Sequence, residues 1–157
     1  YYFYNCTNLA SITLNTPTLT NIVSSAFYSD KPNRLGTVVF GMTNVFTAGS
    51  FSFRNCPALT NLVFYGPMPS IATMDNILNA VTAGTTNHAC VIYASRHQKD
   101  WKGYWTAHPV TEDEFDSRTE PANCRGVYVT AGGARKAWIV EQDSPYDVLK
   151  YFYIRVR

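Results

Sequence analysis

The chain has 157 residues, of which 46% are hydrophobic and 15% aromatic, and its formal net charge is +2 at pH 7. This composition excludes a disordered chain, and the small net charge argues against nucleic acid or an anionic membrane as a partner. Residues 1–94 hold three basic and two acidic residues, so the other 63 residues hold 13 − 3 = 10 basic and 11 − 2 = 9 acidic ones. The chain therefore divides into a weakly charged and a strongly charged part.

No apolar run approaches the roughly 18 residues of a membrane-spanning helix. The chain also lacks a starting Met and a signal-peptide pattern. We expect an excerpt of a longer protein, with no direct membrane insertion in this segment.

A repeated pattern opens the chain. FYNCTNLASITL begins at Phe3 and FRNCPALTNLVF begins at Phe53, and the two agree at six fixed offsets. A degraded third copy lies between them and carries two extra residues within 29–34. The last apolar positions of the three copies, Leu14, Phe40 and Phe64, are 26 and 24 residues apart. A period within the roughly 20 to 29 residues of a leucine-rich repeat turn predicts a solenoid.

Stacked turns of a solenoid bury equivalent side chains in continuous ladders, because one turn cannot bury them alone. We expect one short strand of a parallel sheet per turn, with Phe3, Phe27 and Phe53 on the opposite wall. Asparagine side chains at Asn5 and Asn55 are expected to bind backbone groups at bends. The expected ladder consists of Leu9, Ile12, Leu14, Leu35, Val38, Phe40, Leu59, Leu62 and Phe64.

The strand positions between these apolar residues are predicted to face outward. They form a neutral surface that offers hydrogen bonds and apolar contact without long-range charge attraction. The loop around Lys31 to Arg34 is a second candidate region for ligand contact. The predicted ligand-facing residues of the strands are Ser11, Thr13, Thr37, Val39, Asn61 and Val63.

After the third copy, GPMPS ends a strand and Ser70 is a plausible N-cap of a helix. Ile71, Met74, Leu78 and Val81 recur at helical spacing and predict an apolar face that closes the end of the solenoid core.

A strand over residues 89–94 and a helix from Ser95 follow, with Ser95 and Gln98 as a capping box. Trp101 and Trp105 share one side of this helix. Their rings are interpreted as core, with a carbohydrate-stacking platform as the alternative if they are exposed.

The remaining chain is predicted to be a charged connector over residues 106–121 and a small β module over residues 122–157. Strands over residues 127–131 and 135–140 flank Gly132–Gly133, a dipeptide suited to a tight hairpin. The alternating tail predicts a third strand.

The pattern F-x-N-C-x-x-L-x-x-[IL]-x-[LF], matched at Phe3 and at Phe53, resembles the BspA-like leucine-rich repeats of bacterial cell-surface proteins. Cys6 and Cys56 match the family's cysteine, while the middle copy has Asp30 at this offset. The resemblance covers about residues 1–105, including the tryptophan-containing end unit. It implies an α/β leucine-rich repeat solenoid, mostly β with short parallel strands, capped by short helices and followed by the C-terminal β module.

The cysteines Cys6 and Cys56 lie two turns apart, roughly 10 Å, which is too far for a disulfide. A disulfide between Cys90 and Cys124 is left open. The spacing of cysteines and histidines matches no metal site, and no nucleophile or glycine-rich elbow accompanies His88, His97 or His108. We therefore expect no enzyme and nominate no catalytic, cofactor-binding or metal residue.

These observations favour a non-catalytic interaction protein, at the cell surface or secreted, that adheres to a protein or glycan ligand through the repeat face. The alternative is a purely structural stalk whose polar residues only keep it soluble. In two further alternatives, the repeats serve a larger secreted enzyme such as a glycan hydrolase, or they space the β module as the functional head.

Overall fold

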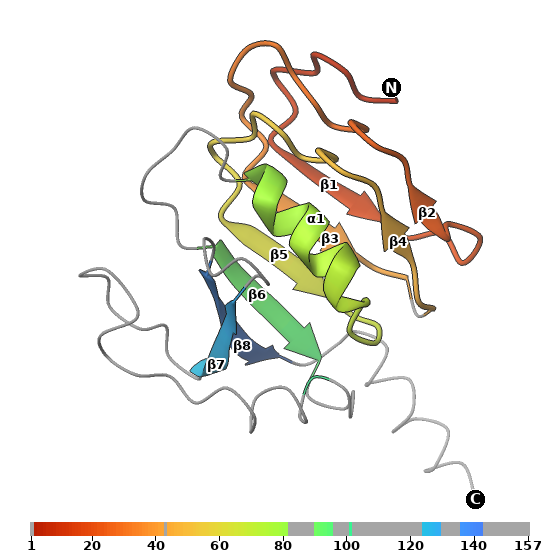
Figure 1. Cartoon of the computed structure of the whole chain (residues 1–157), viewed down its shortest axis with the longest axis vertical. Coiled ribbons are helices and arrows are strands. Elements are labelled where there is room, and N and C mark those ends of the chain that lie inside the picture. Colours follow the sequence, from red (N-terminus) through yellow and green to blue (C-terminus); the bar gives the residue numbers. More distant parts are fainter. Residues whose placement is uncertain are drawn as a thin grey trace, which may run out of the picture.

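The computed structural model describes residues 2–42, 44–81, 90–95, 101, 124–129 and 136–142. Within these ranges the chain forms two sheets and one longer helix (Figure 1). The elements are β1 (Ser11–Leu14), β2 (Asn21–Ile22), β3 (Thr37–Phe40), β4 (Thr47–Ala48), β5 (Asn61–Phe64), α1 (Ile71–Val81), β6 (Cys90–Ser95), β7 (Cys124–Val129) and β8 (Lys136–Gln142).

The main sheet has the strand order β1-β3-β5-β6-β8-β7, and its strands β1, β3, β5 and β6 are parallel neighbours (Figure 1). Leu14 lies opposite Phe40, and Phe40 opposite Phe64, so the predicted stacking of equivalent residues is confirmed. Val38, Leu62 and Phe64 are buried. The leucine-rich repeat interpretation therefore describes how β1, β3 and β5 pack.

The second wall consists of β2 and β4, which pair in parallel. In the third turn α1 takes the corresponding place beside β4 (Figure 1). The Asn76 side chain of α1 donates a hydrogen bond of 2.8 Å to the carbonyl oxygen of Ala48, at the edge of this small sheet. A helical side chain thus satisfies an edge group that another strand would otherwise bind.

The helix begins as predicted, because the Thr73 N–H donates to the hydroxyl oxygen of Ser70 at 3.3 Å. Met74 and Leu78 are buried as predicted, together with Ile77, whereas Ile71 is 61% exposed in the first turn. The side chain of Val81, the fourth residue of the predicted face, lies outside the described side chains. The helix also does not end the core as expected, because the main sheet continues beyond β5 into β6.

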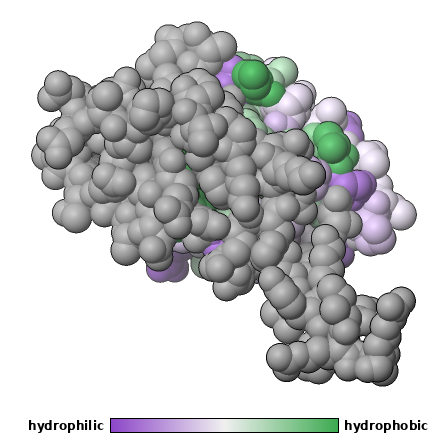
Figure 2. Space-filling view, turned by 90° about the horizontal axis from the view of Figure 1, so that it is seen from below, coloured by the Kyte–Doolittle hydropathy of each residue, from purple (hydrophilic) through white to green (hydrophobic). Residues whose placement is uncertain are grey.

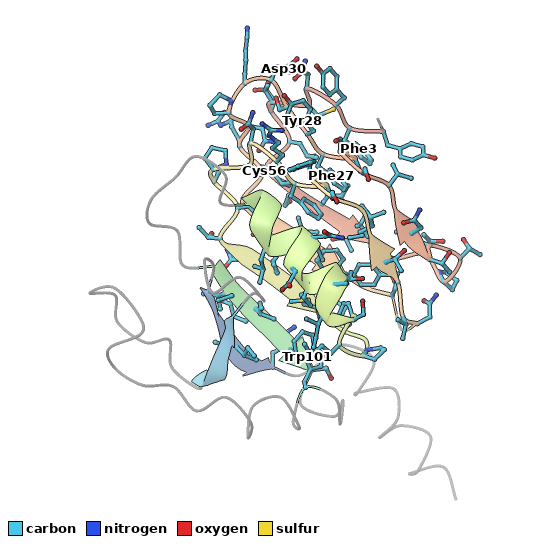
Figure 3. All side chains as sticks on the ribbon, viewed as in Figure 1. Phe3, Phe27, Tyr28, Asp30, Cys56 and Trp101 are labelled. Carbon is cyan, nitrogen blue, oxygen red and sulfur yellow. The ribbon has the colours of Figure 1, made fainter. Side chains whose placement is uncertain are left out.

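Three phenylalanines from successive turns, Phe3, Phe27 and Phe53, form a continuous stack, of which Figure 3 labels Phe3 and Phe27. The ring centroids of Phe3 and Phe27 are 5.0 Å apart, and those of Phe27 and Phe53 are 4.9 Å apart, with interplanar angles of 3° and 4°. Phe27 and Phe53 are buried, while Phe3 is 37% exposed at the outer end of the stack. The predicted phenylalanine wall is confirmed.

The predicted asparagine bends are also confirmed. Asn5 and Asn55 have φ angles of 57° and 62°, in the left-handed region that asparagine tolerates better than most residues. The Asn5 side-chain oxygen accepts a hydrogen bond of 2.8 Å from the Asp30 N–H. The Asn55 side-chain amide donates one of 2.7 Å to the Ser29 carbonyl oxygen. Each asparagine therefore links its own turn to the middle turn.

The middle turn compensates for its missing cysteine. Asp30 is exposed, and Asn33 turns inward instead. The Asn33 side-chain amide donates to the sulfur of Cys56 at 3.1 Å, and its oxygen accepts from the Leu35 N–H at 3.2 Å. The two extra residues in this loop thus bring a polar side chain into contact with the next turn.

Trp101 is buried against the third turn, with its ring centroid 5.3 Å from that of Phe64. Its indole N–H donates to the Gly66 carbonyl oxygen at 3.2 Å. For this residue the core interpretation is confirmed and the carbohydrate-stacking alternative is wrong. Trp105, Gln98 and the rest of the predicted helix lie outside the described residues.

The two strands predicted on either side of Gly132–Gly133 are present as the antiparallel pair β7 and β8. β8 also pairs in parallel with β6, from Cys90 opposite Ala137 to Ser95 opposite Gln142. This pair therefore extends the main sheet. The connector over residues 106–121 and the predicted third strand lie outside the described residues, so the division into domains stays a prediction.

The strand register also decides the disulfide that the sequence left open. Cys90 lies opposite Ala137, while Cys124 lies opposite Val140, three residues further along β8. Cys124 is therefore displaced from Cys90 by about 10 Å along the strands, which is three residues, and by about 10 Å across the sheet, which is two strand spacings. The two cysteines are too far apart to form a disulfide. Cys6, which is exposed, and Cys56, which is buried, are free as predicted.

We expect Phe53→Ala to lower the free energy of unfolding by about 3–5 kcal/mol, because it removes a fully buried ring that packs against Phe27 and Phe40. Phe3→Ala, at the exposed end of the same stack, should cost only about 1 kcal/mol. Urea unfolding of the full chain, followed by circular dichroism, measures both losses. Equal losses would contradict the difference in burial between Phe53 and Phe3 as the cause.

The buried thiol of Cys56 should make stability depend on pH. Burial raises its pKa from 9.0 to about 11, although the Asn33 hydrogen bond partly opposes this shift. Between these values the unfolded chain loses the thiol proton while the folded chain keeps it, so the free energy of unfolding should fall as pH rises. This fall is at most about 3 kcal/mol.

Urea unfolding of the parent chain and of Cys56→Ala at pH 8 to 11 measures this contribution. The stability of the variant should fall less steeply with pH than that of the parent. Parallel curves would show that the thiol does not cause the dependence.

Candidate functional site

The six predicted ligand-facing residues are brought together on the outer face of β1, β3 and β5. The strand register places Thr37 between Ser11 and Asn61 in one row. It places the other three residues in a second, parallel row. We call these two rows the strand face: Ser11, Thr37, Asn61, Thr13, Val39 and Val63.

Exposure along the strand face is uneven. The residues of β1 are exposed, and those of β3 and β5 are half-buried. The Asn61 side-chain amide approaches the hydroxyl oxygens of Thr37 at 3.4 Å and Thr60 at 3.2 Å. One row therefore presents hydroxyl and amide groups, while Val39 and Val63 in the other row present methyl groups.

Sequence reasoning missed the continuation of this face onto β6. Val91 lies opposite Asn61, and Tyr93 lies opposite Val63, and both are half-buried. The alternation of CVIYAS could have indicated them, since Ile92 and Ala94 between them are buried. Tyr93 adds an aromatic ring with a hydroxyl group beside the valine row.

A second cluster lies where the turns bend after the phenylalanine stack. Tyr4, Tyr28 and Arg54 each directly follow one phenylalanine of the stack. The ring centroids of Tyr4 and Tyr28 are 5.7 Å apart. The guanidinium carbon of Arg54 lies 5.7 Å from the Tyr28 ring centroid and 5.1 Å from that of Phe51. We call these four residues the edge stack.

Asp30 lies at the tyrosine end of the edge stack, far from Trp101 (Figure 3). Its carboxylate accepts hydrogen bonds from the Tyr4 hydroxyl and, at 3.3 Å, from the Asn5 side-chain amide. Hydrogen bonds from Tyr4, Asn5 and Tyr28 hold the pKa of Asp30 below its usual range, and the Asp30 bond raises the pKa of Tyr4. The aspartate is therefore an ionised group engaged by its neighbours.

Seen from below, the visible described residues are mostly white to purple, with separate green apolar groups (Figure 2). In the part of the chain that the structure describes, no helix is long and apolar enough to cross a membrane.

The described residues offer few candidates for a catalytic or metal-binding site. His88, His97 and His108 lie outside the described residues. Among the residues described, no three His, Cys, Asp or Glu side chains gather as metal ligands would. The thiol of Cys56 is buried, and its raised pKa keeps it protonated at neutral pH, which makes it a poor nucleophile.

Comparison with known families identifies the repeats. Residues 1–76 match the family model described as BspA type leucine-rich repeat region (6 copies). No curated protein and no solved structure matches the chain. The matched segment covers β1 to β5 and the first half of α1, the same part in which equivalent side chains stack. Residues 1–76 are therefore similar to BspA-type leucine-rich repeats, in agreement with the resemblance carried by the motifs at Phe3 and Phe53.

Proposed function

We propose that this chain is a non-catalytic interaction region of a bacterial cell-surface or secreted protein, which mediates adhesion by binding a protein or glycan ligand through the strand face. The family match supports a surface repeat protein. The observation that carries the proposal is the register, which aligns outward residues from successive strands in two uninterrupted rows.

The strand face is suited to recognition because its shape does not depend on its own side chains. The inward residues Val38, Leu62 and Ile92 are fully buried and hold the strands in register. Outward residues can then vary without loss of the fold. Neighbouring positions lie about 5 Å apart across the strands and about 7 Å apart along them.

The chemistry of the rows indicates the kind of ligand. Ser11, Thr37 and Asn61 can donate and accept hydrogen bonds, while Val39 and Val63 offer apolar contact. None of the six residues is charged, so binding should depend on shape and hydrogen bonding and only weakly on salt. A neutral surface of a folded protein or an uncharged glycan fits these properties.

We expect Thr13→Arg and Val63→Arg each to abolish ligand binding, because a long charged side chain would protrude from the strand face on either side of Val39. Stability should change by only about 0.5 kcal/mol at the exposed Thr13 and by about 1 kcal/mol at the half-buried Val63. The measurement is binding of the full chain to an array of purified extracellular-matrix proteins and neutral glycans.

The matched control is Ala72→Arg, an exposed residue of α1 on the opposite wall, where arginine is also a good helix former. It should bind as the parent does. If the parent binds an array component and all three variants retain that binding, the strand face is not the site.

A further inference from the structure

The edge stack contains a phenylalanine that the fold does not require. Phe51 lies two residues before Phe53, as Ser25 lies two residues before Phe27, so the two occupy the same place in successive turns. Their φ angles are 60° and 59°. The left-handed region is unfavourable for a bulky residue, and the neighbouring turn makes the same bend with serine. The bend therefore gives no reason for an aromatic residue here.

The side chain of Phe51 is also 52% exposed, so it contributes little of the stabilising free energy that a buried phenylalanine provides. Its described ring contact is the guanidinium group of Arg54. A large apolar side chain placed in solvent, in a strained backbone conformation, indicates a role other than core packing.

Arg54 is exposed and places its guanidinium group over two aromatic rings, those of Tyr28 and Phe51. Within the described ranges no carboxylate forms an ion pair with it. A stacked guanidinium retains in-plane N–H donors that match the two oxygens of a carboxylate or sulfate group. The arrangement therefore resembles half of a bidentate anion site.

The local charge favours an anionic ligand. The loop that carries Lys31 and Arg34 lies directly against the turn at residues 54–55, as shown by hydrogen bonds from the Ser29 and Asn33 N–H groups to the carbonyl oxygens of residues 54 and 55. Both basic side chains are exposed. The one acidic residue of this loop, Asp30, already accepts hydrogen bonds from Tyr4 and Asn5. The stack thus contains one positive group, Arg54, and the adjoining loop adds two more positive groups and one negative group.

We propose that the edge stack of Tyr4, Tyr28, Phe51 and Arg54 is a second binding site, separate from the strand face, for an acidic saccharide whose pyranose ring carries a carboxylate or sulfate group. The guanidinium edge of Arg54 binds the anionic group. The rings of Tyr4 and Phe51 offer apolar surface to the C–H face of a pyranose. Tyr4 is 40% exposed and Phe51 52%, so part of each ring is accessible.

The test measures binding of the full chain to three probes by isothermal titration calorimetry. These are an oligogalacturonate, a neutral maltooligosaccharide with the same number of rings, and an oligoglutamate of equal charge. The galacturonate should bind at least roughly tenfold more tightly than either of the others, because only it combines flat rings with anionic groups.

Two variants examine the stack itself. Phe51→Ser installs the residue of the neighbouring turn and should leave the melting temperature unchanged or raise it. Arg54→Lys keeps the charge but removes the planar group. Each should weaken galacturonate binding roughly tenfold. Thr13→Gln, on the strand face, should leave it unchanged, so failure of the strand-face proposal is distinguishable from failure of this one.

Three results would overturn the proposal. Unchanged binding by Phe51→Ser and Arg54→Lys would show that the stack takes no part. Equal affinity for oligoglutamate would show that charge alone, as in an acidic peptide, is recognised. A lowered melting temperature of Phe51→Ser with intact binding would assign Phe51 to stability alone.

Discussion

Stacking of like side chains between successive turns is the constraint on which the whole structure depends. The phenylalanine rings are 4.9 and 5.0 Å apart, close to the spacing of about 4.8 Å between hydrogen-bonded strands. Ring stacking and backbone pairing therefore require the same distance and support each other. A turn that shifted by one residue along its neighbour would break the ring stack and turn the inward residues Val38 and Leu62 to solvent.

The bends preserve this spacing when the sequence departs from the repeat. Asn5 and Asn55 adopt left-handed conformations and bind backbone groups of the middle turn. The middle turn lacks both the asparagine and the cysteine at these places, and Asn33 supplies an inward polar contact with Cys56. The register of Leu14, Phe40 and Phe64 is unchanged across this irregular loop. Irregular residues are thus accommodated at the bends, while the strands remain uniform.

The two proposed binding surfaces share a physical origin, since the side chains of both lie outside the stacked core and their identity is not fixed by core packing. The strand face is neutral and is formed by alternate strand residues, whereas the edge stack is aromatic and positively charged. This difference in charge means that the two surfaces should attract different ligands. It also allows salt dependence to distinguish them, because only the edge stack should respond strongly to ionic strength.

The local signals in the sequence were sufficient for much of the fold. The period of 26 and 24 residues predicted which side chains stack, the asparagines predicted the bends, and Ser70 predicted the start of α1, because each of these features depends on residues at fixed offsets. The alternation within β1, β3 and β5 likewise predicted the six residues of the strand face.

Tertiary structure alone decided the rest. Pairing of β8 with β6, the distance between Cys90 and Cys124, and the place of α1 beside β4 depend on contacts between segments that no repeat relates. The edge stack was hidden for a related reason. Its aromatic and cationic residues lie in different turns, and only stacking of those turns converts a separation of about 25 residues along the chain into a contact between neighbouring side chains.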